Sequence, residues 1–197
     1  LSTFYRIVAD YKFFNVGSLR YNNTGDPSNI YTNKFYVGIE DVKAENNANN
    51  FKVDQLILGN YAATFGQGLV FASGDYRRAR FTGYKFSKRM LGVYPDISLS
   101  EELTLNGLAL QLSNKYFRVS LFFSEDERDA IINADDSFTS LIFMRPRLGF
   151  GANNNNQDRI YEDMVDAVTE QTRGANFRFS INEGTNFGFT YYESLYD

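Results

Sequence analysis

Residues 175–182 read Ala-Asn-Phe-Arg-Phe-Ser-Ile-Asn, so apolar and polar side chains alternate throughout this stretch. Successive side chains of a β-strand point to opposite faces of its sheet, and the alternation therefore predicts a strand with one apolar and one polar face. Residues 182–185, Asn-Glu-Gly-Thr, predict a turn, after which Phe187, Phe189 and Tyr191 continue the apolar row. We expect an antiparallel hairpin here.

The same period of two recurs along most of the chain. It predicts a strand over residues 4–13, a second over 34–43, and a hairpin whose strands cover 103–112 and 116–123. Further strands are expected at residues 51–59, 61–72, 80–91 and 137–149. The total is about ten strands.

The connections between these strands are of two kinds. Some are tight turns, whereas residues 21–33, 45–50 and 151–157 are long polar tracts. Short turns at one end and long loops at the other are typical of outer-membrane barrels. Residues 158–171 place apolar side chains at helical spacing, which predicts one short loop helix.

Composition limits how this chain can cross a membrane. No stretch approaches the ~18 consecutive apolar residues that a transmembrane helix needs, so any crossing must use strands. The sequence contains 19 Phe and 14 Tyr but only 3 Pro, a mixture that favours strands over disorder. Its 197 residues suit one domain, 1–197. The first residue is Leu1 and no signal segment follows it, so we expect a processed chain or a piece of a longer one.

Missing residue types exclude several classes of function. The chain has no cysteine and no histidine, which removes thiolate nucleophiles, imidazole bases and Cys/His zinc sites. The net charge of −4 gives no overall attraction to nucleic acid. Residues 66–68, Gly-Gln-Gly, lack the third glycine and the Lys-Ser/Thr of a phosphate-binding loop. We therefore expect no catalysis, no cofactor, no metal site and no nucleic-acid partner.

The apolar rows are dominated by Phe and Tyr, whereas soluble cores usually mix Val, Ile and Leu. In a transmembrane barrel the outward row meets lipid and the inward row holds water, small residues and charges. This reading predicts that Arg6, Asp10, Arg118 and Arg178 face the lumen. A secreted soluble β-domain shows the same alternation and remains an alternative.

Residues 58–71 read Leu-Gly-Asn-Tyr-Ala-Ala-Thr-Phe-Gly-Gln-Gly-Leu-Val-Phe. This run resembles a signature of outer-membrane β-barrel proteins of Bacteroidota and related bacteria, which often carry an N-terminal helix-hairpin-helix domain. Residues 94–102, 106–109 and 169–174 are similar to further parts of that pattern. The core of the run is Phe65, Gly66, Gln67 and Gly68, to which we assign a structural role, because glycine in a strand permits a bend or close backbone approach.

The resemblance covers roughly residues 51–197 and implies a barrel larger than this chain, which would then be a fragment of a longer protein. No helix-hairpin-helix segment is present. The resemblance implies location and architecture, and no catalytic or ligand residue is carried over from it.

Charged residues concentrate in two places. The acidic residues of 125–136 do not follow the order of a calcium-binding loop, so a solvated rim is expected. Basic residues gather over 77–89, where they could contact lipid phosphates or line an anion-favouring lumen, or simply pair with lumen carboxylates. The candidates for lumen, anion or lipid contact are Arg77, Arg78, Arg80, Lys85, Arg118 and Arg178.

Together these features predict an all-β chain: an antiparallel transmembrane β-barrel, or a segment of a larger one, with about ten strands and one short loop helix. We expect a porin-like structural, pore-forming or transport role in the bacterial outer membrane, with outer-membrane lipid and other envelope proteins as partners. The alternatives are a non-enzymatic scaffold or binding subunit of a cell-surface assembly, and a secreted soluble β-domain that binds glycans.

Overall fold

The computed structural model describes residues 4–21, 31–43, 51–66, 70–73, 92–99, 104–135, 137–141, 164, 166–182 and 185–197. Their strands are β1 (Phe4–Tyr11), β2 (Phe14–Tyr21), β3 (Thr32–Lys43), β4 (Lys52–Phe65), β5 (Phe71–Ala72), β6 (Gly92–Pro95), β7 (Leu105–Ser113), β8 (Phe117–Arg128), β9 (Ala130–Ile132), β10 (Phe138–Leu141), β11 (Val168–Asn182) and β12 (Thr185–Tyr196). The predicted all-β, antiparallel class is confirmed.

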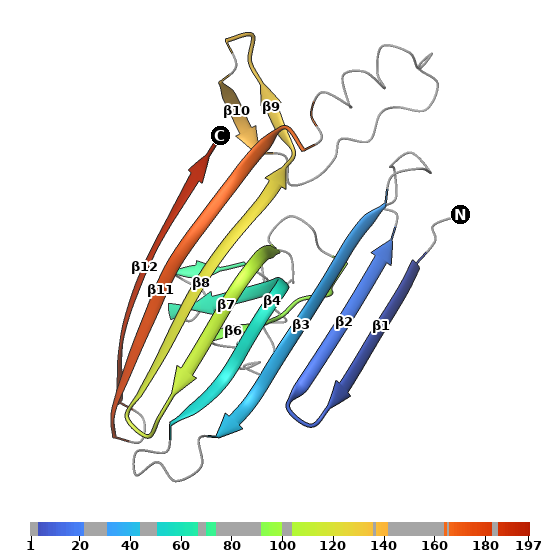
Figure 1. The fold of residues 1–197 in the computed structure, drawn as a ribbon. Coiled ribbons are helices and arrows are strands. Elements are labelled where there is room, and N and C mark those ends of the chain that lie inside the picture. Colours follow the sequence, from blue (N-terminus) through green and yellow to red (C-terminus); the bar gives the residue numbers. More distant parts are fainter. Residues whose placement is uncertain are drawn as a thin grey trace, which may run out of the picture.

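One curved sheet holds most of these strands, in the order β1-β2-β3-β4-β7-β8-β11-β12 (Figure 1). β5 and β6 pair with β4 off this path, and β9 with β10 forms a separate two-stranded sheet. Within the described residues the large sheet is open, because β1 and β12 each pair along one edge.

Several predicted boundaries were wrong. The strand predicted over 4–13 is the first half of a hairpin: Tyr11 pairs with Phe14, and Lys12, with a φ of 55°, reverses the chain. β2 was not predicted, and neither were β6 and β9. The strands predicted over 51–59 and 61–72 are instead the continuous β4 followed by the two-residue β5.

Other predictions lie wholly or partly outside the described residues. The strand predicted over 80–91 lies wholly outside them. Of the strand predicted over 137–149, β10 forms the described part and residues 142–149 lie outside. The loop helix predicted over 158–171 also lies mostly outside them. The helix prediction is wrong for its last four residues, 168–171, because these residues form a strand that pairs with β8. The β-branched side chains of Val168 and Thr169 suit a strand.

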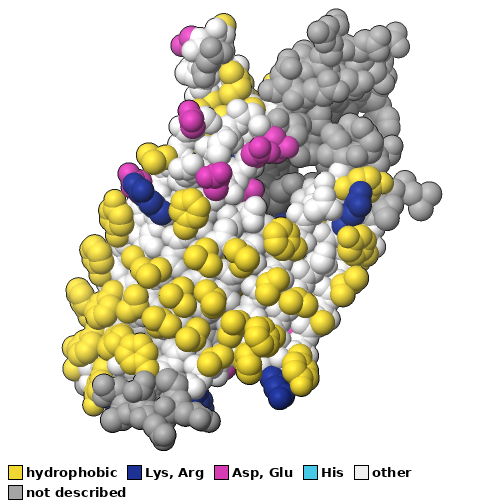
Figure 2. All heavy atoms as spheres, viewed as in Figure 1, with side chains coloured by type: hydrophobic (Ala, Val, Ile, Leu, Met, Phe, Trp, Pro, Cys, Tyr) yellow, Lys and Arg dark blue, Asp and Glu magenta, His cyan; other side chains and the backbone are white. Residues whose placement is uncertain are grey.

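The two faces of the large sheet differ in what covers them. The exposed face points away from β5 and β6 and carries exposed Phe, Leu, Val and Tyr side chains (Figure 2). One row of cross-strand partners crosses all eight main strands on this face and is apolar throughout. Its members are Tyr11, Phe14, Ile39, Leu56, Leu110, Leu121, Ala175 and Tyr191.

The covered face carries the molecule's buried core. At Gly59 the pairing of β4 with β3 ends, and the pairing with β7 ends at Tyr61. Tyr61–Phe65 then pairs with β6 and β5 behind the sheet in Figure 1. We call the described residues 61–66, 70–73 and 92–99, which include β5 and β6, the inward element. Its rings fill the concave side of the sheet: Phe65 stacks on Phe122 at 5.6 Å, and Phe71 meets Tyr192 at 4.9 Å. The inward element thus reaches from β4 to β12.

Gly59 is required where β4 separates from β3. Its φ is 105°, and a Cβ there would collide with the backbone carbonyl of Phe35. Gly59→Ala is therefore expected to lower the free energy of unfolding by about 1–3 kcal/mol, as read from denaturant unfolding of the refolded chain. Gly188→Ala is the control, since a Cβ at Gly188 meets nothing nearer than Phe177 O at 3.8 Å; a change within about 0.5 kcal/mol is expected. Equal losses in both variants would contradict this assignment.

Candidate functional site

The apolar band of the exposed face ends in charges at the edge opposite the hairpin turns. Arg173 on β11 and Glu193 on β12 form an ion pair at 2.9 Å. Along the exposed face, Glu125 is the next residue after Phe123 on β8, and Arg20 is the last exposed-face residue of β2. Figure 2 shows this pattern as a field of apolar side chains with charged groups near its two ends. The exposed face is therefore apolar in the middle and polar at its margins.

Both margins of the band shift in the same direction across the sheet. The row of cross-strand partners that contains Phe14, at the first hairpin turn, also contains Leu121 on β8 and Ala175 on β11. Beyond this row, β8 extends by four residues, to Phe117, and β11 extends by seven residues, to Asn182. At the other margin, the row of cross-strand partners that contains Arg173 also contains Phe123 on β8 and Val16 on β2. The first charged residue on the exposed face beyond this row is Glu125 on β8, two residues further, and Arg20 on β2, four residues further.

The shift amounts to about one residue per strand. A rise of about 3.3 Å for each spacing of about 4.8 Å between strands corresponds to a tilt of about 35°. Along β8 and the turn before it, the interval from Lys115 to Glu125 carries no charge on the exposed face. It measures about 33 Å along the strand, or about 27 Å at that tilt, close to the ~25 Å apolar band of outer-membrane barrels.

Tyrosines and cations meet at both margins of the band. Lys12 lies 5.4 Å from the ring centre of Tyr11 and Lys115 lies 5.6 Å from that of Tyr116, both at hairpin turns. At the opposite margin Arg20 lies 4.3 Å from the ring of Tyr31. Amphipathic rings beside cations are typical of groups that sit between hydrocarbon and water.

The covered face is polar toward the hairpin turns, and the inward element buries part of this polar surface: Val93 N donates to Gln111 Oε1 at 3.3 Å. Toward the hairpin turns, one row of cross-strand partners consists of polar side chains: Glu40, Gln55, Gln111, Ser120, Asn176 and Thr190. A neighbouring row in that direction is basic. It consists of Lys43, Lys52, Ser113, Arg118, Arg178 and Gly188.

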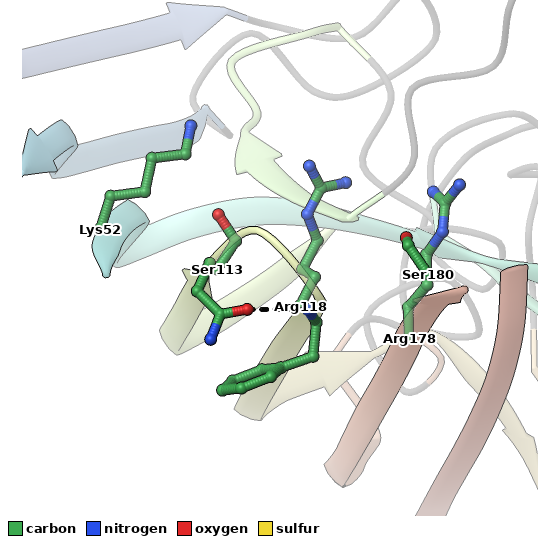
Figure 3. A pocket seen from close by; sticks show the side chains of 7 residues that line it. Lys52, Ser113, Arg118, Arg178 and Ser180 are labelled. Atoms are coloured by element: carbon green, nitrogen blue, oxygen red, sulfur yellow. Dashed lines mark hydrogen bonds between the residues drawn. The ribbon is translucent and has the colours of Figure 1, made fainter. Parts of the chain in front are cut away.

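An open cavity of about 300 Å³ lies over the basic row. Its lining is Lys52, Ser113, Asn114, Phe117, Arg118, Arg178 and Ser180. Figure 3 shows Arg118 and Arg178 extending side by side from the sheet, with Lys52 beyond Ser113. We call this cavity the basic pocket. All of its lining residues except Asn114 lie on β4, β7, β8 and β11. The register of these four strands therefore brings the lining residues together.

Among the described residues, Asp54 is the carboxylate nearest to the pocket's cations. It projects from a bulge in β4 and is 8% exposed. Its Oδ1 lies 2.8 Å from Lys52 Nζ and its Oδ2 lies 3.3 Å from Arg118 Nε. Ser113 Oγ donates to Asp54 Oδ1 at 2.8 Å. Asp54 thus anchors one side of the basic row.

A second buried charge pair ties the inward element to the sheet. Lys34 on β3 is 3% exposed; its Nζ donates to Thr104 Oγ1 at 2.6 Å and lies 3.5 Å from Asp96 Oδ2. Thr104 Oγ1 donates in turn to Asp96 Oδ2 at 2.8 Å, and Ser98 N donates to Oδ1 at 3.0 Å. Burial raises the pKa of Asp96, but the charge of Lys34 and these hydrogen bonds outweigh it, so the pKa lies below its ordinary value.

The structure brings together some of the residues predicted from sequence. Arg118 and Arg178 are direct cross-strand partners in the basic pocket. Arg6 and Asp10 lie on the covered-face side of β1, where they are exposed. Their predicted role in a lumen stays a prediction.

Of the structural motif, Phe65 is buried and Gly66 has a φ of 59°. The positive φ at Gly66 fits the bend expected of a glycine at this position. The remaining predicted site residues lie outside the described residues; they are Gln67, Gly68, Arg77, Arg78, Arg80 and Lys85.

Sequence reasoning missed Lys52, Asp54 and the Lys34–Asp96 pair. The acidic residues of β8 were expected to form a solvated rim, yet Asp126 lies on the covered face, 3.3 Å from Arg128. Arg128 also donates to Glu170 at 2.9 Å. A period of two assigns faces but does not say which strands are neighbours, so these pairs had no local signal.

Comparisons with known proteins give no match to a family model, to a curated protein or to a solved structure. Among the residues that the structure describes, no helix is long and apolar enough to cross a membrane. The same residues contain no group of three or more carboxylates placed to hold a metal ion.

Proposed function

We propose that this chain forms part of the wall of a transmembrane β-barrel in a bacterial outer membrane, with a structural or transport role and without catalysis. The observation that carries the proposal is the unbroken apolar row on the exposed face, from Tyr11 to Tyr191, opposite polar rows on the covered face. An apolar surface of this extent facing water would be costly, whereas facing lipid it is favourable.

The slanted margins give independent support. In a barrel the strands tilt by 35–45° from the axis, so a flat membrane crosses neighbouring strands at shifted residues. The band follows this geometry at both ends. A soluble sheet has no reason to keep exposed Phe, Leu and Val within two parallel slanted limits.

Closing the barrel requires further strands beside β1 and β12. Backbone groups cannot be left unpaired in hydrocarbon, so only a closed sheet is stable there. This agrees with the barrel larger than the chain that the sequence resemblance implies. We propose that the additional strands complete an enclosed aqueous interior, lined by the polar and basic rows of the covered face.

A plugged barrel that serves as a scaffold is the second candidate, and a specific observation favours it. The inward element crosses the covered face, with Phe71 of β5 against Tyr192 of β12. Aromatic packing of this kind would fill the middle of a lumen. In that case the barrel would act through its loops and its partners in the envelope rather than as an open pore.

A single introduced tryptophan tests the proposal, because the chain contains none. Leu121→Trp places the reporter in the centre of the exposed face, and Thr190→Trp places it on the covered face. After the complete barrel that contains these residues is refolded into vesicles, lipids brominated on their acyl chains are expected to quench the Leu121→Trp variant strongly and the Thr190→Trp variant weakly. Bilayer conductance then separates an open pore from a plugged scaffold.

Two results would overturn the membrane assignment. One is equal quenching of the two reporters in vesicles. The other is a chain that is folded and monodisperse in plain buffer, which would favour the secreted soluble β-domain. Refolded protein should also migrate differently on gels before and after boiling, as closed membrane barrels do.

A further inference from the structure

The basic pocket carries more positive charge than its own side chains balance. Arg118 and Arg178 lie directly opposite each other on β8 and β11, and like charges at such positions destabilise a sheet. Lys52 also lies opposite Lys43 on β3. A row chosen for stability alone would alternate charges or use neutral side chains.

The nearby carboxylates leave Arg178 unbalanced. Asp54 pairs with Lys52 and approaches Arg118, and the exposed Asp41 pairs with Lys52 at 3.2 Å. Within the described parts of the chain, Arg178 has no carboxylate partner; its Nε donates to the neutral Asn186 Oδ1 at 3.2 Å. One guanidinium is thus held in place by a neutral group.

Arg118 is only partly satisfied. Its Nε is buried and 3.3 Å from Asp54 Oδ2, but no described acceptor meets it in hydrogen-bonding geometry. The remaining guanidinium nitrogens point with those of Arg178 toward the cavity of about 300 Å³ (Figure 3). Two neighbouring guanidinium groups present planar sets of N–H donors, which suit the oxygens of a phosphate or carboxylate.

We propose that the basic pocket binds an oxyanionic solute, a phosphate- or carboxylate-bearing small molecule, through Arg118 and Arg178, with Lys52 supplying further positive charge. Ser113 and Ser180 line the same cavity, but their hydroxyl groups already donate to Asp54 and Asn186, so the arginines supply the donors. The pocket lies on the hairpin-turn side of the inward element. This inference rests on the proposed function only for the route by which the solute reaches the pocket. In a closed barrel, the basic pocket would lie in the lumen and open toward the end with the hairpin turns.

The test is calorimetric titration of the refolded full chain with inorganic phosphate, and separately with acetate, at low ionic strength. Removing one charge-assisted partner by Arg178→Gln is expected to weaken phosphate binding about tenfold. Arg173→Gln is the matched control, since it removes the same charge from the exposed face; binding within about twofold of the unaltered chain is expected. The two titrants show whether the site prefers phosphate or carboxylate oxygens.

Arg178→Lys keeps the charge but not the planar donor set, so intermediate binding is expected. The proposal is overturned if the unaltered chain binds neither anion, or if Arg178→Gln and Arg173→Gln weaken binding equally. The tryptophan reporters separate this failure from failure of the membrane proposal. If lipid quenches the Leu121→Trp reporter but the protein binds no anion, only the anion-binding proposal is refuted. If the protein is soluble in plain buffer yet binds phosphate through Arg178, only the membrane proposal is refuted.

Discussion

Leu121→Lys is expected to destabilise the lipid-embedded chain by about 2–4 kcal/mol, whereas Glu125→Lys on the same strand is expected to change stability by about 0–1 kcal/mol. Both residues lie on the exposed face of β8. Leu121 is 49% exposed and sits in the middle of the apolar row, between Leu110 and Ala175. An ammonium group there would lie in hydrocarbon, while at Glu125 it would lie at the charged margin.

The measurement is denaturant unfolding of both variants in lipid vesicles, followed by the gel shift between folded and unfolded forms. The two substitutions control for each other, because they lie on one strand and introduce the same side chain. If the exposed face met water instead, Leu121→Lys would change stability by about 0.5 kcal/mol or less. Equal effects at the two positions would therefore count against a lipid-facing surface.

The alternation of side chains predicted the faces of the C-terminal strands correctly. Phe177 and Phe189 are cross-strand partners on the exposed face, and Arg178 lies on the covered face. From Phe177 to Phe189 each face has one kind of environment, so local sequence is sufficient there. This is the part of the fold that a period of two can specify.

The alternation failed where the inward element packs against the sheet. β2 presents Asn15, Gly17 and Leu19 to the covered face, a mixture that hides the apolar period. Gly17 is small because a Cβ there would collide with the ring of Tyr36. That ring comes from the neighbouring strand, so the choice of glycine depends on a contact that local sequence does not contain.

The basic pocket was missed as a unit for a related reason. Arg118 and Arg178 were singled out separately, but Lys52 joins them only through the register that aligns β4, β7, β8 and β11. The highest density of basic residues in the sequence, over 77–89, drew attention to a segment outside the described residues. Charge density along the chain is a poor guide to charge density across a sheet.

Asp96→Asn is expected to destabilise the chain by about 3–5 kcal/mol, because it removes the carboxylate that lies 3.5 Å from the buried Lys34 ammonium group. Lys34 and Asp96 side chains are 3% and 15% exposed. The pair fastens the inward element to β3, so its loss should also loosen the element itself. Protease cleavage within residues 92–99, mapped by mass spectrometry, is expected to increase in the variant.

A double-mutant cycle distinguishes the charge pair from other effects of the substitution. Lys34→Met removes the buried charge, so Asp96→Asn should cost much less in the Lys34→Met background than in the unaltered chain. The pH dependence follows from the lowered pKa of Asp96. The stabilisation is fully present above the ordinary pKa of an aspartate and is lost as pH falls through the lowered value. Additive effects in the cycle, or an acid-induced loss of stability that is as large in Asp96→Asn as in the unaltered chain, would show that the pair does not hold the inward element in place.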